Sequence, residues 1–176
     1  MVSLVNLTLF CVLSIVFIHL HLREGGALII HSPVLMRSGG EVFRDEDWDP
    51  HAYGSMENLF VEGTWNSEFA DEVKPSESDI ILRNRVNFSA FRGTILKDVI
   101  ETHGITRLFV MGFLTNVCVE ETTVEARELF PDLKIYVCSD GCAAKTKQVN
   151  GHTIYEYYTI TAIPWSAIWE TIYCMQ

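Results

Sequence analysis

Short apolar runs alternate with amphipathic stretches along the chain, and this alternation constrains the fold more than any other feature. Each run has the length and unbroken apolar character of a strand buried on both faces: 27–31, 79–82, 107–112 and 134–138. Helical periodicity covers 93–103, with Thr94 as N-cap and Gly104 as stop, and then 117–129. This order predicts an α/β fold, a three-layer sandwich in which helices cover both faces of a mostly parallel sheet. Binding sites in such a sheet lie at the carboxyl ends of the strands.

The size and charge of the chain exclude several classes of protein. Its 176 residues fit a single domain. The 23 acidic against 13 basic residues give a net charge of −10 and leave no basic stripe for a phosphate backbone, so we expect no nucleic-acid partner. The 5 cysteines are odd in number and form no CxxC pair, which favours a reducing compartment. We therefore expect a cytoplasmic protein.

The first 22 residues form an apolar segment without Asp, Glu, Lys or Arg. By length this segment could anchor the chain in a membrane, which is the alternative to a cytoplasmic location. Polar residues interrupt the run and no basic residue precedes it, so a buried helix or strand of the core is the other interpretation. We treat residues 1–22 as an atypical N-terminal segment and residues 23–176 as one domain.

Acidic residues are concentrated in the segment 41–79, which holds 12 of the 23. Aromatic residues, including Trp48 and Trp65, are interspersed among them. We predict a long, mostly irregular segment here. Loops of this length in compact domains often close over a binding site. A solvent-exposed surface loop without a binding role fits the composition equally well.

Cys118 occupies a position that suits a nucleophile. The predicted strand 107–112 passes through a turn into the helix predicted from residue 117, which places Cys118 in the first helical turn at the carboxyl edge of the sheet. Unpaired backbone N–H groups and the positive end of the helix dipole favour a thiolate there and can hold an oxyanion. A purely structural role, as a small buried hydrophobic residue, fits Cys138 and Cys174 better.

The segment around Cys118 resembles the isochorismatase-like cysteine hydrolases, a family that includes nicotinamidases, carbamoylsarcosine amidases and biuret hydrolases. The family pattern is Gly, two residues, Thr, Asn or Asp, one residue, Cys and Val after a strand, and GFLTNVCV at 112–119 matches it at every position. REGGALIIHSP at 23–33 and SAFRGTIL at 89–96 resemble two further family segments. Asp140 falls where the family has an Asp after its next strand. The resemblance spans about residues 23–169.

This resemblance implies hydrolysis of a small amide without a cofactor. The Cys118 thiolate would attack the carbonyl carbon, and the backbone amides of Leu114 and Cys118 would hold the oxyanion, next to a cis peptide bond at Phe113–Leu114. Phe88, Phe113 and Trp48 are candidate substrate-binding residues, although each fits a core aromatic residue as well. Oligomers are common in the family, so we expect a homo-oligomer.

Two parts of the family's catalytic triad are not in place. The family has an Asp at the end of its first strand, in a segment like LLVIDMQNDF, whereas no Asp precedes Asp45 here. It has a Lys about six residues before the SAF phenylalanine, where this chain has Arg85, with Arg83 as the alternative. A guanidinium supplies positive charge but does not transfer a proton. The family's first strand lies in the middle of its sheet, so either the opening apolar segment fills that place as a strand or helix, or the sheet is incomplete, as in a truncated or mis-spliced chain.

A metal site is a further alternative, because nicotinamidases bind a metal through an Asp and several His residues. The candidate ligands here are Asp47, Asp49, His31 and His51. Their spacing does not match a site with three protein ligands, so we expect no metal and no other cofactor.

Two hypotheses for the function remain. The complete cysteine motif favours a cysteine hydrolase, impaired or not, that cleaves the C–N bond of a small amide. The absent Asp favours a catalytically inactive relative that uses the same fold as a binding or assembly module, tethered to a membrane if residues 1–22 anchor it.

Overall fold

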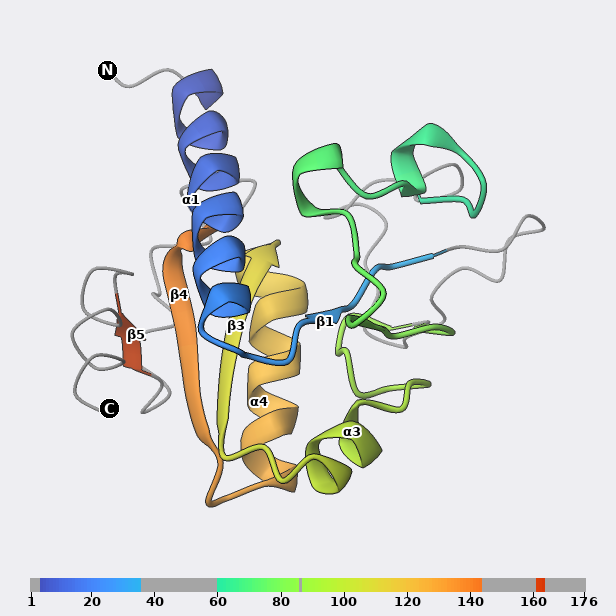
Figure 1. Cartoon of the computed structure of the whole chain (residues 1–176), viewed down its shortest axis with the longest axis vertical. Helices are drawn as coiled ribbons and strands as arrows, with labels where there is room; N and C mark the ends of the chain where they lie inside the picture. The colour runs from blue at the N-terminus through green and yellow to red at the C-terminus, as the bar shows by residue number, and fades with distance from the viewer. Residues whose placement is uncertain (1–3, 36–59, 86, 144–160, 164–176) are drawn as a thin grey trace.

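The computed structural model describes residues 4–35, 60–85, 87–143 and 161–163 (Figure 1). Its elements are, in chain order, α1 (Leu4–Glu24), β1 (Ile30–His31), η1 (Trp65–Ser67), η2 (Asp71–Val73), β2 (Ile80–Ile81), α3 (Leu96–Thr102), β3 (Arg107–Phe113), η3 (Thr115–Val119), α4 (Glu120–Leu129), β4 (Lys134–Ala143) and β5 (Thr161–Ile163). The strand pairs are parallel. The predicted α/β fold with parallel strands is confirmed.

Helices cover both faces of the β3–β4 pair. Successive side chains of a strand point to opposite faces. Leu108 and Val110 of β3 pack in the core that α3 and α4 contribute to, whereas Phe109 and Met111 pack with α1. Figure 1 shows α1 and α4 on opposite sides of these strands, which gives the three layers.

The sheet is split into two parts. β1 pairs with β2, and β4 lies between β3 and β5. Across the described ranges, no backbone hydrogen bond joins β1 to β3. The opening apolar segment does not fill this gap as a strand, because it forms helix α1 and packs on β4 instead.

Helix α1 is held to the sheet by one side. Ile18 is fully buried against Cys138 of β4, whereas Leu13 on another side of the helix is 59% exposed. The glycine at position 141 allows close packing of β4 against β3, because a Cβ there would lie only 3.1 Å from the Cβ of Met111. Within the described part of the chain, no helix has both the length and the apolar character needed to cross a membrane.

Several element boundaries differ from the sequence prediction. β1 and β2 have two residues each, and β4 continues beyond residue 138 because Cys142 and Ala143 pair with the end of β3 after an irregularity in register. The second predicted helix begins earlier, as a π-helical turn at Thr115. Thr94 accepts a hydrogen bond from the Leu96 N–H at 3.1 Å and so caps the start of α3, although the N-cap residue itself is Ile95.

Candidate active site

Cys118 lies where β3 ends and α4 begins. β3 runs to Phe113, the Phe113–Leu114 peptide bond is cis, and the chain forms the π-helical turn of η3 before it enters α4. Gly112 has a φ of 133°, a conformation that glycine adopts readily because it has no Cβ. The Cys118 side chain is half-buried in this turn. The location at a strand end and a helix start is the one predicted from the sequence.

Backbone hydrogen bonds close the turn around Cys118. The N–H groups of Val117 and Val119 both donate to the Leu114 carbonyl, at 3.1 and 3.2 Å. Within the described residues, the N–H of Leu114 itself makes no hydrogen bond to another backbone group. The two amides predicted to hold an oxyanion, those of Leu114 and Cys118, therefore lie on one short turn.

Arg85, and not Arg83, is the cation beside Cys118. Arg83 is exposed, whereas Arg85 is only 6% exposed. Burial lowers the pKa of Arg85, while the charge of a Cys118 thiolate and its hydrogen bond to the guanidinium oppose that effect. The guanidinium stays protonated, because arginine titrates far above neutral pH.

The guanidinium of Arg85 is held by uncharged oxygen atoms. Its Nε donates to the Asn87 carbonyl at 3.0 Å, and its Nη1 donates to the carbonyl and hydroxyl of Ser32 at 2.6 and 3.0 Å. Its Nη2 donates to the Phe88 carbonyl. Among the described residues, Arg85 forms no ion pair with a carboxylate. A negative charge on a neighbouring group or on a bound ligand would balance this buried cation.

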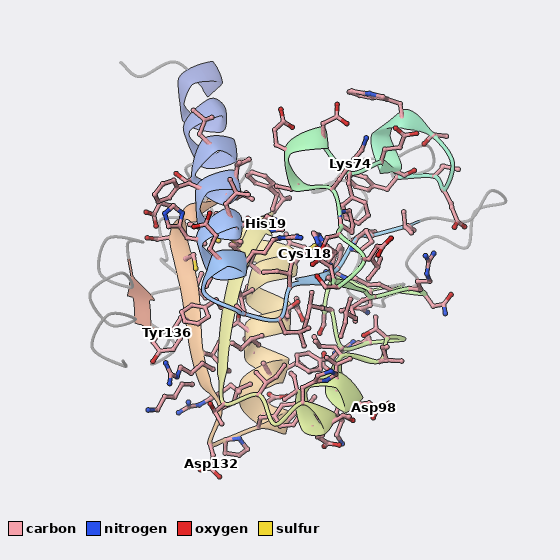
Figure 2. All side chains as sticks on the ribbon, in the orientation of Figure 1. His19, Lys74, Asp98, Cys118, Asp132 and Tyr136 are labelled. Atoms are coloured by element: carbon pink, nitrogen blue, oxygen red, sulfur yellow. The ribbon has the colours of Figure 1, made fainter. Side chains whose placement is uncertain are left out.

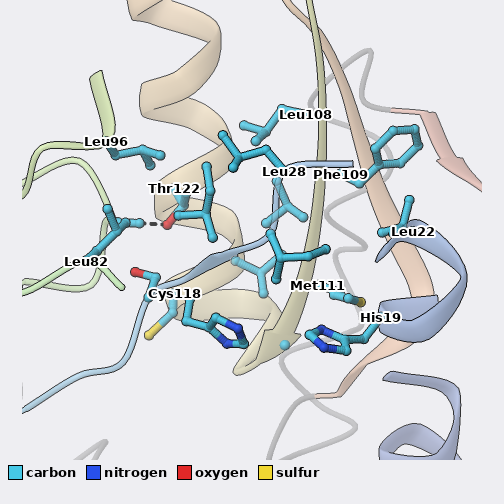
Figure 3. A pocket seen from close by; sticks show the side chains of 18 of the residues that line it. His19, Leu22, Leu28, Leu82, Leu96, Leu108, Phe109, Met111, Cys118 and Thr122 are labelled. Atoms are coloured by element: carbon cyan, nitrogen blue, oxygen red, sulfur yellow. Dashed lines mark hydrogen bonds between the residues drawn. The ribbon is translucent and has the colours of Figure 1, made fainter. Parts of the chain in front are cut away.

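A cavity of about 480 Å³ opens beside Cys118, between β1 and β3 (Figure 3). Cys118, Arg85 and Phe113 all line it, so the fold brings these predicted site residues together. Phe88 is not among the lining residues, and it contributes its carbonyl to Arg85 instead. Trp48 lies outside the described residues. Most of the lining is apolar, and it includes Leu28, Leu82, Leu96, Leu108 and Met111.

A buried polar cluster adjoins this cavity, and nothing in the sequence indicated it. The Asp79 carboxylate accepts hydrogen bonds from Arg23 Nη2 at 2.5 Å, from His31 Nε2 at 2.9 Å and from the hydroxyl and N–H of Ser76. Arg23 Nη2 also lies 2.9 Å from Nε2 of His19. No motif could reveal this cluster, because its members come from α1, β1 and the start of β2, which are far apart in the chain.

These contacts shift the pKa values of Asp79 and His19. Burial raises the pKa of Asp79, but the hydrogen bonds from Ser76, His31 and Arg23 outweigh burial and hold this pKa below its usual range. Burial, together with the charges of Arg23 and His31, lowers the pKa of His19. Figure 2 shows His19 at the same end of the sheet as Cys118.

The remaining predictions concern a metal site and the structural role of Cys138. Within the described ranges, no three His, Cys, Asp or Glu side chains gather as metal ligands. Of the candidate ligands, His31 is bonded to Asp79, and Asp47, Asp49 and His51 lie outside those ranges. Burial, followed by the charges of Cys142 and Asp140, raises the pKa of Cys138 to about 12, which fits an inert core thiol.

Comparison with known proteins identifies the family. The isochorismatase domain model matches residues 15–163, which is most of the chain. The chain belongs to the isochorismatase family. This confirms the resemblance inferred from the cysteine motif. The match begins within α1, whereas the sequence prediction starts the domain at residue 23.

One solved structure and two sequence relatives illustrate this membership. A solved isochorismatase family protein from Desulfovibrio vulgaris is 25% identical, with a TM-score of 0.78 over 93% of this chain and 84% of that one. The ureidoacrylate amidohydrolase RutB of Klebsiella pneumoniae is 39% identical over 36% of this chain and 27% of its own length. An Arabidopsis thaliana protein named as a probable inactive nicotinamidase is 28% identical over 68% of this chain and 59% of its own. The chain thus spans only about a quarter of RutB.

Proposed function

We propose that this chain is a cysteine hydrolase that cleaves the C–N bond of a small amide through a thioester on Cys118. The observation that carries the proposal is the placement of Cys118 on the cavity wall beside Arg85, a buried cation without a carboxylate partner in the described part of the chain. A positive charge beside a cysteine favours the thiolate, which is the nucleophilic form.

The reaction would follow the geometry of the turn. The Cys118 thiolate attacks the carbonyl carbon, and the amides of Leu114 and Cys118 stabilise the oxyanion. The amine leaves with a proton taken from a water molecule, and water then hydrolyses the thioester, which releases the carboxylic acid and restores the Cys118 thiolate. Arg85 does not transfer protons. His19 and His31 also line the cavity, and a ring nitrogen of each contacts Arg23 and Asp79 respectively.

The name of RutB supports an amide substrate, because that relative is called an amidohydrolase. The mostly apolar lining of the cavity supports a small substrate with few charges. Phe113, which is 45% exposed at the cavity, is positioned to contact such a substrate.

A second candidate function is a non-catalytic binding module. One observation favours it: no Asp or Glu is present among the described lining residues, so none of these residues offers a carboxylate to act as a base. The Arabidopsis relative named as inactive is consistent with loss of activity in this family.

Thiol reactivity and hydrolysis together distinguish the two functions. For a hydrolase, we expect iodoacetamide to alkylate Cys118 rapidly already at pH 7, and a panel of small amides to release ammonia or amine. Cys118→Ala should abolish this release and leave the melting temperature nearly unchanged. Cys138→Ala, which removes a buried thiol that packs against Ile18 and Leu22 of α1, serves as the control and should retain activity.

Substitution of Arg85 tests the source of the reactivity. Arg85→Gln should slow alkylation at pH 7 by about tenfold or more, because it removes the cation that stabilises the thiolate, and Arg85→Lys should slow it less. Slow alkylation of the wild-type protein at pH 7, together with no turnover of any amide, would support the binding module instead.

A further inference from the structure

His19 lies where α1 meets the two short strands β1 and β2. It is only 6% exposed, although another side of the same helix faces solvent. Its Nε2 lies 2.9 Å from Nη2 of Arg23, one turn further along α1. The same Nη2 donates to Asp79, directly before β2, and the Asp79 carboxylate also accepts from His31 of β1. His19 and Arg23 therefore connect α1 to both strands through one carboxylate.

The contact with Arg23 determines which nitrogen of His19 carries a proton. A guanidinium has N–H donors and no acceptor, so Nε2 of His19 is the unprotonated nitrogen that accepts the hydrogen bond. A proton on Nε2 would place two donors, each on a positively charged group, at this distance from one another. The hydrogen bond therefore exists only while His19 is neutral.

Asp79 does not offer a protonated His19 a replacement for this bond. Its Oδ2 already accepts from Arg23, from His31 and from the N–H of Ser76. The rings of His19 and His31 also face each other, with centroids 5.6 Å apart. A second positive charge at His19 would therefore lie against Arg23 without a free oxygen of Oδ2 to receive it.

The charged groups that act on His19 are thus Arg23, His31 and Asp79. Burial, followed by the charges of Arg23 and His31, lowers the pKa of His19, and the charge of Asp79 opposes this effect. The charged residues on the other elements that pack against α1 are Arg107 of β3, Lys134 and Asp140 of β4, and Asp71 and Glu72 of η2. None of these five is among the groups that shift the pKa of His19.

We propose that His19 is a pH-sensitive switch that holds the end of α1 to β1 and β2. A proton on Nε2 breaks the bond from Arg23 and releases the turn between α1 and β1. The rest of α1 stays on β4, because the cluster around Ile18 that holds it there is apolar. His19 and Leu22 line the cavity beside Cys118, so the switch acts on one wall of that cavity (Figure 3).

Urea denaturation of the full chain at pH 7.5 and pH 5.5 tests this inference. The pKa of His19 in the folded protein lies below that of an unfolded chain, about 6.5. The unfolded state therefore binds the proton first, and stability is lost as pH falls below that value. His19→Gln keeps an acceptor for Arg23 but does not titrate. We expect the midpoint of the wild type to fall from pH 7.5 to pH 5.5 by more than that of His19→Gln.

His21→Gln is the matched control on the same helix. His21 contacts the Phe17 carbonyl through Nδ1, at 2.8 Å, on an exposed part of α1. Its substitution removes a histidine and leaves the bond between His19 and Arg23 in place. We therefore expect His21→Gln to show the same fall with pH as the wild type.

Amide hydrogen exchange measures the release itself and needs only the wild-type protein. The N–H groups of residues 25–27 donate to carbonyls in the last turn of α1. After correction for intrinsic exchange, we expect their protection to be at least about threefold lower at pH 5.5 than at pH 7.5. Protection of α4 should not change, and His19→Gln should keep the protection of residues 25–27 at both pH values.

Three results would overturn the proposal. They are an equal fall of the denaturation midpoint in the wild type and in His19→Gln, unchanged protection of residues 25–27 at pH 5.5, and an equal loss of protection in residues 25–27 and α4. The last would mean that acid loosens the whole fold and not the end of α1. None of these measurements involves hydrolysis, so their outcome is independent of the proposed enzymatic function.

Discussion

Single residues in this protein show two different ways to stabilise a buried charge. Asp79 has a side chain only 2% exposed and is neutralised by Arg23 and by hydrogen bonds from His31 and Ser76. Arg85 is equally enclosed but is surrounded by carbonyl and hydroxyl oxygens and by a thiol. The first arrangement satisfies a charge and fixes structure, whereas the second leaves a cation available to a thiolate or a substrate.

The Asp79 cluster makes stability depend on pH. Because the pKa of Asp79 in the folded protein lies below that of the unfolded chain, about 3.9, its contribution is fully present above that value and is lost as pH falls further. Asp79→Asn should therefore lower the free energy of unfolding at pH 7 by about 2 to 3 kcal/mol and flatten the decline of stability below pH ~4.

Urea denaturation at pH 7 and pH 3 measures this effect. Asp132→Asn, at an exposed carboxylate at the opposite end of the sheet, is the matched control and should change little (Figure 2). If Asp79→Asn were as stable as the wild type at pH 7, the cluster would have no structural role.

At the scale of elements, a few polar contacts connect the helices to the segment that carries Arg85. The Ala90 N–H, in a fully buried stretch after Arg85, donates to the Thr122 hydroxyl of α4 at 3.0 Å. Nearby, Thr94 donates to the Ala90 carbonyl at 2.5 Å and caps α3. These bonds position the backbone that in turn holds the guanidinium.

Removal of the Thr122 hydroxyl should weaken this connection. Thr122→Val keeps the side-chain shape but leaves the buried Ala90 N–H without an acceptor, which costs about 1 to 3 kcal/mol. We expect a lower denaturation midpoint and a slower alkylation of Cys118, because Arg85 is held less firmly. Thr102→Val, at an exposed helical position, should leave both measurements unchanged.

The whole molecule depends on α1 to cover a sheet that is not continuous. α1 packs on β4 through a small cluster centred on Ile18, and its His19 and Arg23 reach the Asp79 cluster near β1 and β2. The helix therefore spans both parts of the split sheet, and it connects them where no strand pairing does so in the described residues.

The packing of α1 can be tested with two substitutions on the same helix. Ile18→Ala opens a cavity in a fully buried position and should lower the free energy of unfolding by about 3 kcal/mol. Leu13→Ala, at a position 59% exposed, should change it by less than about 0.5 kcal/mol. Equal effects in chemical denaturation would contradict the observed orientation of α1.

The sequence alone determined the features that depend on local pattern. Alternating apolar runs gave the parallel α/β architecture, and the glycine, the turn and Cys118 lie within eight consecutive residues, so their relative placement follows from local geometry. Only the tertiary structure decided which apolar segment becomes a strand: residues 4–24 are as apolar as a core strand, but form a helix because β4 offers a face to cover. It also selected Arg85 over Arg83 and assembled the Asp79 cluster, because burial and contacts between distant segments are set by packing and not by neighbours in the chain.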